Sequence, residues 1–284
     1  MSDALFADWA PLDWIWFVYV GLMGACLGSF ANVVIYRLPR GESVVRPRSR
    51  CGSCGTPIPF RHNIPILSWF LLRGKCASCG ARYSFRYPAV EMLMAALFAV
   101  AYLEMGWSWT LLESLIFIFS LVTVSFIDLD HMILPDTFTL SGIVIGLLGA
   151  LLNPEREFLD SVYGVLLGGG FLWAIAYLYF VVRKREGMGG GDIKLLAWTG
   201  AVLGWKAIPF VILVASLLGS VVGVGMALLA LRRRTSESDA TVDDAEVASF
   251  AIPFGPFLAL GALLYLLLDG AELARLYLEW HGLV

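Results

Sequence analysis

The sequence predicts an all-α polytopic membrane protein with about eight transmembrane helices and a cytoplasmic four-cysteine loop that binds zinc. Its 284 residues are 59% apolar and only 15% charged, whereas soluble domains are nearer half apolar and a quarter charged. The apolar residues gather in long runs, and four of the five cysteines form two C-x-x-C pairs. This composition excludes a soluble enzyme, a secreted disulfide scaffold and a disordered tail protein.

The apolar runs have lengths suited to a bilayer, which a helix of about 20 residues crosses. They lie at about 14–36, 89–105, 109–127, 137–153, 161–182, 192–205, 208–231 and 251–268. The sixth run is short for a full span. The first 13 residues contain Asp3, Asp8 and Asp13 but no Lys or Arg, unlike the basic start of a cleaved signal peptide. We therefore expect the first run to be a retained helix.

Lys and Arg concentrate in alternate loops, and loops with this bias lie in the cytoplasm. Ten of them fall within 37–86, and further clusters follow the fifth and seventh runs at 183–185 and 232–234. With eight spans, both termini then lie outside the cytoplasm. The loops at about 37–88, 128–136, 183–191 and 232–250 are cytoplasmic. We expect the basic loop to bind anionic lipid, and we expect no nucleic-acid partner.

The cysteine pairs indicate a metal site. Cys51 and Cys54 form the first C-x-x-C, and Cys76 and Cys79 form the second. Each pair presents two thiolates to one ion, so that two pairs complete a tetrahedral four-cysteine site typical of structural zinc. Thiols stay reduced in the cytoplasm, which disfavours disulfides. The glycine after each pair suits the turn of such a knuckle. Four thiolates leave no open coordination position, so this zinc is expected to be structural. The alternatives to a zinc site are redox chemistry or an unligated loop.

The fifth cysteine has a different environment. Cys26 lies within the first apolar run, beside Gly24, Ala25 and Gly28. Small residues of this kind mark close helix contacts in membranes. We expect Cys26 to be a small buried residue at such a contact.

Two carboxylates occur at the ends of apolar runs, where ionisable groups are costly. Asp128 follows the third run and Asp192 begins the sixth. The two runs cross in opposite directions, so both side chains are expected near the cytoplasmic surface. Paired carboxylates share one proton, because a like charge at short range disfavours the second ionisation. The ionised partner activates a water and the protonated one polarises a peptide carbonyl, which is aspartic-protease chemistry.

A run of glycines comes directly before the second carboxylate. Gly189, Gly190 and Gly191 carry no side chains, so a substrate backbone can approach this loop closely and pair with it in an extended form. A flexible loop or a close helix crossing explains the glycines equally well.

Other acids follow Asp128 closely. Asp130 is its main rival for the catalytic role, although we expect Asp130 to be solvated. Asp136 comes after Pro135 and is expected to be the N-cap of the next helix.

The ordered set of motifs resembles the type IV prepilin leader peptidases, which are GxGD-type aspartic proteases of the bacterial inner membrane. It comprises both C-x-x-C pairs and the segments 28–39 (GSFANVVIYRLP), 86–91 (RYPAVE), 128–136 (DLDHMILPD), 189–194 (GGGDIK) and 252–257 (IPFGPF). A G-x-G-D motif alone is weak evidence, but the ordered set covers nearly the whole chain and is highly specific.

The resemblance implies that Asp128 and Asp192 are the catalytic pair. It implies that the substrates are precursors of type IV pilins and of type II secretion pseudopilins, cut at the cytoplasmic membrane face after a glycine. It also implies that the new N-terminal residue is methylated with S-adenosylmethionine, because the cysteine loop is characteristic of bifunctional members. No methyl-donor motif is visible, so the residues that bind this cofactor are not identified.

The domain organisation follows from these assignments. Residues 1–36 are expected to form the first transmembrane helix, 37–88 the cytoplasmic zinc-binding loop associated with methyl transfer, and 89–284 the transmembrane aspartic peptidase domain. The apolar helix of the mature pilin is expected to dock among the spans. Cytoplasmic acids, notably Glu42, Glu91 and those between Glu237 and Glu246, are expected to contact the basic leader.

Three alternatives differ in where the carboxylates lie. A presenilin-like or signal-peptide-peptidase-like GxGD protease would place them deeper in the membrane and would not need the cysteine loop. A proton-coupled transporter would show acids at the midplane and repeated halves. A membrane-anchored zinc module without enzymatic activity would leave the glycine run before Asp192 unexplained.

Overall fold

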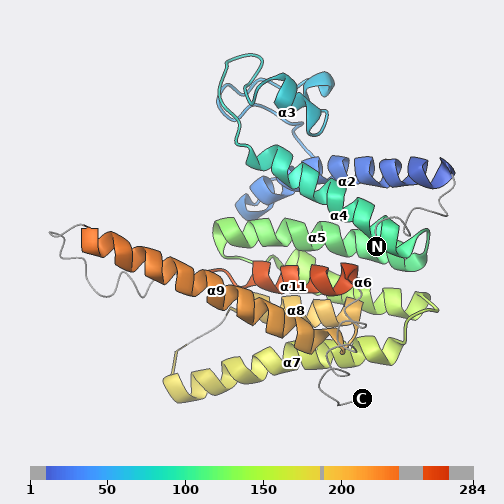
Figure 1. The fold of residues 1–284 in the computed structure, drawn as a ribbon, viewed down its shortest axis with the longest axis vertical. Coiled ribbons are helices and arrows are strands. Elements are labelled where there is room, and N and C mark those ends of the chain that lie inside the picture. Colours follow the sequence, from blue (N-terminus) through green and yellow to red (C-terminus); the bar gives the residue numbers. More distant parts are fainter. Residues whose placement is uncertain (1–10, 186–188, 237–251, 269–284) are drawn as a thin grey trace. The chain divides into compact units, whose positions relative to one another are not determined.

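The computed structural model describes residues 11–185, 189–236 and 252–268 (Figure 1). Each of the eight predicted runs coincides with a helix in this part of the chain. These helices are α2 (Pro11–Arg37), α4 (Arg86–Met105), α5 (Trp109–His131), α6 (Asp136–Leu152), α7 (Phe158–Arg183), α8 (Gly190–Leu203), α9 (Ala207–Ser236) and α11 (Gly255–Leu267). The loop between α2 and α4 adds the short helices η1 (Leu38–Arg40), η2 (Phe60–His62) and α3 (Leu67–Leu71).

Five of the described helices are long and apolar enough to cross a membrane: α2, α4, α5, α7 and α9. Helices α6 and α11 are apolar but shorter, and α8 has 14 residues. Large apolar side chains remain exposed on the long helices, among them Leu22 of α2, Leu166 of α7 and Val221 of α9. Such exposure is expected for surfaces that face lipid. The chain is a multi-pass membrane protein, and the count of eight crossings stays a prediction.

The chain divides into two compact units, Met1–Ile127 and Asp128–Val284. In the first unit, α2 packs against α4. A Cβ atom built at Gly24 would lie 2.7 Å from the carbonyl oxygen of Met94, and one at Gly28 would lie 2.8 Å from the Cα of Glu91. The two helices approach this closely because both positions lack side chains.

Cys26 does not take part in this helix contact. The prediction of a buried position is wrong, because the Cys26 side chain is exposed. Gly24 and Gly28 are four residues apart and face α4, whereas the intervening Cys26 lies on another side of the helix.

In the second unit, α8 is the central helix. It contacts α6, α7, α9 and α11, and its residues from Leu195 to Ala201 are all buried. A Cβ at Gly164 of α7 would lie 2.1 Å from the carbonyl oxygen of Gly200 of α8, so the two backbones touch. Helix α8 is surrounded by other helices and has little surface to present to lipid. This position accounts for the short sixth apolar run.

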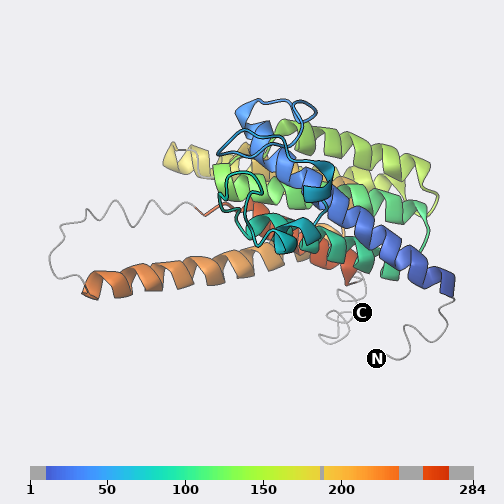
Figure 2. The ribbon, with the colours of Figure 1, turned by 90° about the horizontal axis from the view of Figure 1, so that it is seen from above.

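Helix α9 is the longest element described, with 30 residues. It contacts α11 along part of its length, and its C-terminal part extends away from the other helices of its unit (Figure 2). The segment that follows it, including the predicted leader-contacting acids between Glu237 and Glu246, and the C-terminal tail lie outside the described residues.

Candidate active site and cysteine site

Asp128 lies in the last turn of α5, and its side chain is only 5% exposed. The backbone amide of Gly255, at the first position of α11, faces this carboxylate and stabilises its negative charge. A Cβ at position 255 would lie 2.5 Å from Oδ2 of Asp128. Gly255 therefore brings a backbone donor up to the carboxylate at a distance that no side chain would permit. Asp130, the rival position, is exposed.

Asp192 lies in the first turn of α8 and is half-buried. The charge of Asp128 acts on Asp192, so the structure places the two carboxylates singled out from the sequence in the same region. Asp192 lies in the first turn of α8, and α11 begins at Gly255 beside Asp128. Helix N-termini stabilise negative charge through their free N–H groups. The arrangement suits a pair that carries one proton and one negative charge.

Leu134 joins these elements and was not recognised from the sequence. Its side chain lies 2.9 Å from a Cβ built at Gly191 and 3.2 Å from one built at Gly255. It therefore packs between the start of α8 and the start of α11. Leu134 belongs to the Leu-Pro-Asp segment of the motif at 128–136. That pattern does not reveal its packing partners, because Gly191 and Gly255 are distant in the sequence.

The glycine run is only partly a loop. Gly189 precedes α8, whereas Gly190 and Gly191 form its first turn. Gly191 is required by the close approach of Leu134, while a Cβ at Gly189 or at Gly190 would meet nothing within 4 Å. The open space around these two positions leaves room for a substrate backbone.

Asp136 is not an N-cap, contrary to the prediction. Pro135 occupies that position, and Asp136 is the first residue of α6. Its Oδ1 accepts a hydrogen bond of 2.6 Å from the ammonium group of Lys194. The side chain is therefore used in an ion pair that holds the start of α6 against the start of α8.

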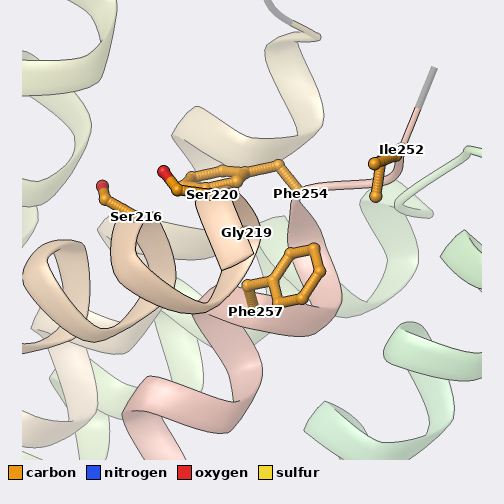
Figure 3. Close-up of a pocket in the computed structure, with 6 residues that line it drawn as sticks. All are labelled: Ser216, Gly219, Ser220, Ile252, Phe254 and Phe257. Carbon is orange, nitrogen blue, oxygen red and sulfur yellow. The ribbon is translucent and has the colours of Figure 1, made fainter. Parts of the chain in front are cut away.

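A cavity of about 360 Å³ lies between α9 and α11 (Figure 3). Small residues of α9 form one wall and apolar residues around the start of α11 form the other. The lining residues are Ser216, Gly219, Ser220, Ile252, Phe254 and Phe257. Phe254 directly precedes Gly255, so the cavity adjoins the segment that contacts Asp128.

The four predicted cysteine ligands come together in the first unit. The Sγ atoms of Cys51, Cys54, Cys76 and Cys79 all lie within 4.8 Å of one another, and those of Cys51 and Cys79 are 3.9 Å apart. Four sulfurs at about 2.3 Å from a tetrahedral zinc are about 3.8 Å apart. No disulfide joins these cysteines, and the cluster fits a tetrahedral metal ion.

The two knuckles have the same backbone geometry. Gly55 N donates to Cys51 O, and Gly80 N donates to Cys76 O, each at 2.9 Å. Both glycines have positive φ, 69° and 74°, which L-residues with side chains adopt at a cost. The predicted role of the glycines in the knuckle turns is therefore confirmed.

Surrounding groups favour the thiolate form of Cys51 and Cys76, whereas the neighbouring Cys54 thiol and burial raise the pKa of Cys79 to about 11. The amides of Cys79 and then Ser78 lower the pKa of the Cys76 thiol. The nearby Tyr83 hydroxyl, followed by the amides of Cys54 and Ser53, lowers the pKa of Cys51 to about 6. Thiolates are the form that ligates metal.

The helical scaffold, the carboxylate pair and the cysteine cluster define a multi-pass membrane protein with a candidate aspartic peptidase site. Residues 22–105 match the family described as bacterial peptidase A24 N-terminal domain, and residues 115–224 match the type IV leader peptidase family. No solved structure matches the chain.

Curated relatives agree with this assignment. The chain is 37% identical to the prepilin leader peptidase/N-methyltransferase of Aeromonas salmonicida (strain A449), over 94% of this chain and 96% of that protein. It is 35% identical to the protein of the same name from Pseudomonas aeruginosa, over 92% and 93%. For that of Myxococcus xanthus (strain DK1622) the identity is 41%, over 80% and 68%. The chain belongs to the type IV leader peptidase family, and the resemblance stated from the sequence is confirmed.

Proposed function

We propose that this chain cleaves the short basic leader from prepilins and pseudopilins and then N-methylates the new N-terminal residue. The relatives named prepilin leader peptidase/N-methyltransferase support both activities, and the match to the type IV leader peptidase family supports the first. The enzyme acts in the bacterial inner membrane, with its carboxylates at the cytoplasmic face. The distribution of Lys and Arg among the loops supports this orientation.

Asp128 and Asp192 are the catalytic pair in this proposal. The observation that carries it is the buried Asp128 carboxylate, which lies against Gly255 and whose charge acts on Asp192. A backbone N–H that faces a carboxylate favours its charged form. We therefore assign the general base to Asp128 and the shared proton to Asp192.

Hydrolysis then follows from the two protonation states. Ionised Asp128 takes a proton from a water, whose oxygen forms a bond to the scissile carbonyl carbon. Asp192 donates its proton to the carbonyl oxygen, which gives a neutral tetrahedral diol. Asp128 then returns its proton to the leaving nitrogen while the C–N bond breaks and the diol becomes a carboxylic acid, whose proton restores Asp192.

The substrate must reach this pair with its apolar helix still in the membrane. The cavity between α9 and α11 supports an approach from this side, because Phe254 lines it and the adjacent Gly255 contacts Asp128. We place the first turns of the mature pilin helix there. The leader then runs past Gly189 and Gly190, where no side chain stands in the way.

The methyltransferase activity involves the cysteine loop in this proposal. Zinc at the four cysteines would link the two knuckles into one rigid unit within residues 37–88. With four thiolate ligands it would have no open position for a substrate. S-adenosylmethionine would supply the methyl group. The peptidase domain then comprises residues 89–284, and the first transmembrane helix lies within residues 1–36.

The proposal is tested with the purified full chain and a synthetic prepilin, with products identified by mass spectrometry. We expect a shortened product, and with S-adenosylmethionine a further gain of one methyl group. Asp128→Asn and Asp192→Asn should each lower cleavage by roughly 10²–10⁴-fold while methylation of a pre-cut substrate continues. Asp130→Asn is the matched control two residues away and should be mild.

The alternatives give other results in the same experiment. An inactive Asp130→Asn with an active Asp128→Asn would overturn the choice of residue. Cleavage inside the apolar helix would indicate a presenilin-like protease. A transporter or a zinc module without enzymatic activity would yield no shortened product.

A further inference from the structure

The hydroxyl group of Tyr83 is buried and makes no hydrogen bond of standard geometry. Among the side chains that the structure describes, its oxygen is the one buried polar atom in this condition. An unsatisfied buried hydroxyl costs about 1–3 kcal/mol, so its presence calls for an explanation.

The position of Tyr83 is set by residues that flank the second knuckle. Its backbone N–H donates to the carbonyl oxygen of Gly74 at 2.7 Å, and its own carbonyl accepts from Nε1 of Trp69 at 3.3 Å. Its ring packs edge-on to Tyr87, with centroids 6.4 Å apart. The two hydrogen bonds fix the main chain of Tyr83 and Tyr87 packs against its ring, so the hydroxyl stays beside the cysteine cluster.

The polar neighbours of this hydroxyl are the sulfurs of Cys51 and Cys76. These are the two buried members of the cysteine cluster, whereas Cys54 and Cys79 are exposed to solvent. No hydrogen bond of standard geometry joins the hydroxyl to either sulfur. A protonated thiol is a weak acceptor, but a metal-bound thiolate is a charged one and accepts more strongly.

We propose that Tyr83 is a positioning residue for the metal, and that its hydroxyl donates a hydrogen bond to the Cys51 or Cys76 thiolate when zinc is bound. This inference rests on the proposed zinc site and not on the peptidase. Four thiolates give a divalent site an excess of two negative charges. A donor on the buried side, which water does not reach, reduces the repulsion among them and orients the ligands.

The test measures metal binding by the full chain in detergent. Zinc affinity is obtained by competition with a chelator, and Co²⁺ replaces zinc to report the geometry by its thiolate charge-transfer absorption. Tyr83→Phe removes only the hydroxyl. We expect it to weaken zinc binding by about 10–100-fold and to shift the Co²⁺ absorption, with about one ion per chain still bound at saturation. Tyr87→Phe is the matched control and should behave as the wild type.

A second readout separates this role from a merely structural one. In the metal-free protein, Tyr83→Phe removes an unsatisfied buried group, so its thermal unfolding temperature should stay equal or rise. In the zinc-bound protein, Tyr83→Phe should lower the thermal unfolding temperature. Equal affinity and absorption in Tyr83→Phe and wild type would overturn the proposal, and so would an equal loss of stability with and without metal. A wild type that binds no zinc would instead overturn the metal site itself.

Discussion

Oε2 of Glu91 accepts a hydrogen bond of 2.6 Å from the backbone N–H of Ile66. Glu91 lies in the second turn of α4 and is buried, and Ile66 lies in the loop between the two cysteine pairs. This carboxylate therefore ties the loop to the helix. The prediction that Glu91 contacts the substrate leader is wrong, because its side chain is buried and already bonded.

Ile66 has an unusual backbone conformation, with φ 64° and ψ −59°. The N–H of Leu67 donates to the carbonyl oxygen of Pro65 at 2.6 Å, which closes a three-residue γ-turn. Positive φ is strained for a β-branched residue, and strain of this kind persists only where the surroundings enforce it. The Glu91 carboxylate provides that support.

Removing the carboxylate should loosen the loop. Glu91→Ala leaves the Ile66 N–H without its partner, and we expect a loss of about 1–3 kcal/mol in stability. Hydrogen exchange at residues 64–68 should become faster. Glu91→Gln keeps an acceptor oxygen and should be milder, and Glu104→Gln, an exposed position of the same helix, should change nothing. Unchanged hydrogen exchange in Glu91→Ala would contradict the proposed role of the Glu91–Ile66 hydrogen bond.

Adding one methyl group beside Asp128 should impair cleavage without removing a catalytic group. In Gly255→Ala the new Cβ would lie 2.5 Å from Oδ2, so the carboxylate must move. A displacement of this size costs up to about 10²-fold in rate, and we expect kcat to fall by at least about tenfold. Gly225→Ala has no neighbour within 4 Å and serves as the control. Wild-type kcat in Gly255→Ala would contradict the assigned geometry.

The glycine run should separate packing from substrate approach. Gly191→Ala forces Leu134 away from the start of α8 and should lower the unfolding temperature. Gly190→Ala has free space around it and should leave that temperature unchanged. If the substrate backbone passes Gly190, its substitution should raise KM for the precursor. An unchanged KM would remove Gly190 from the proposed approach path.

The crossing of α7 and α8 should not tolerate a side chain. A Cβ in Gly164→Ala would lie 2.1 Å from the backbone oxygen of Gly200. A rotamer change cannot relieve this clash, because the atom that the Cβ meets belongs to the backbone. We expect a loss of about 1–3 kcal/mol or more, measured by thermal unfolding in detergent. Gly170→Ala in the same helix meets nothing within 4 Å and should be neutral. Equal unfolding temperatures for the two variants would contradict this crossing.

The cysteine cluster should hold about one zinc per chain, measured by elemental analysis of the purified protein. Cys76→Ser should lower that occupancy, because three thiolates leave the tetrahedral site incomplete. Cys26 lies outside the cluster, so Cys26→Ser should leave the zinc content unchanged. Full occupancy in Cys76→Ser would argue against a four-cysteine site.

Several features depend on local chemistry and were therefore predictable from the sequence. Apolar length specifies a helix in lipid, because the backbone must satisfy its own hydrogen bonds there, and each predicted run is a helix. The knuckles need only a C-x-x-C and a glycine at positive φ. The family was recognisable because its motifs occur in order along the chain.

Other features arise where segments distant in the sequence meet. Burial separates Asp128 from Asp130 because α11 brings Gly255 against one of them and not the other. Asp136 pairs with Lys194, 58 residues away, and this partner rather than the local Pro-Asp pattern determines its role. The tertiary structure likewise places the Tyr83 hydroxyl beside two sulfurs. A local sequence pattern encodes how a segment folds, whereas a side chain's neighbours depend on which other segments pack against it.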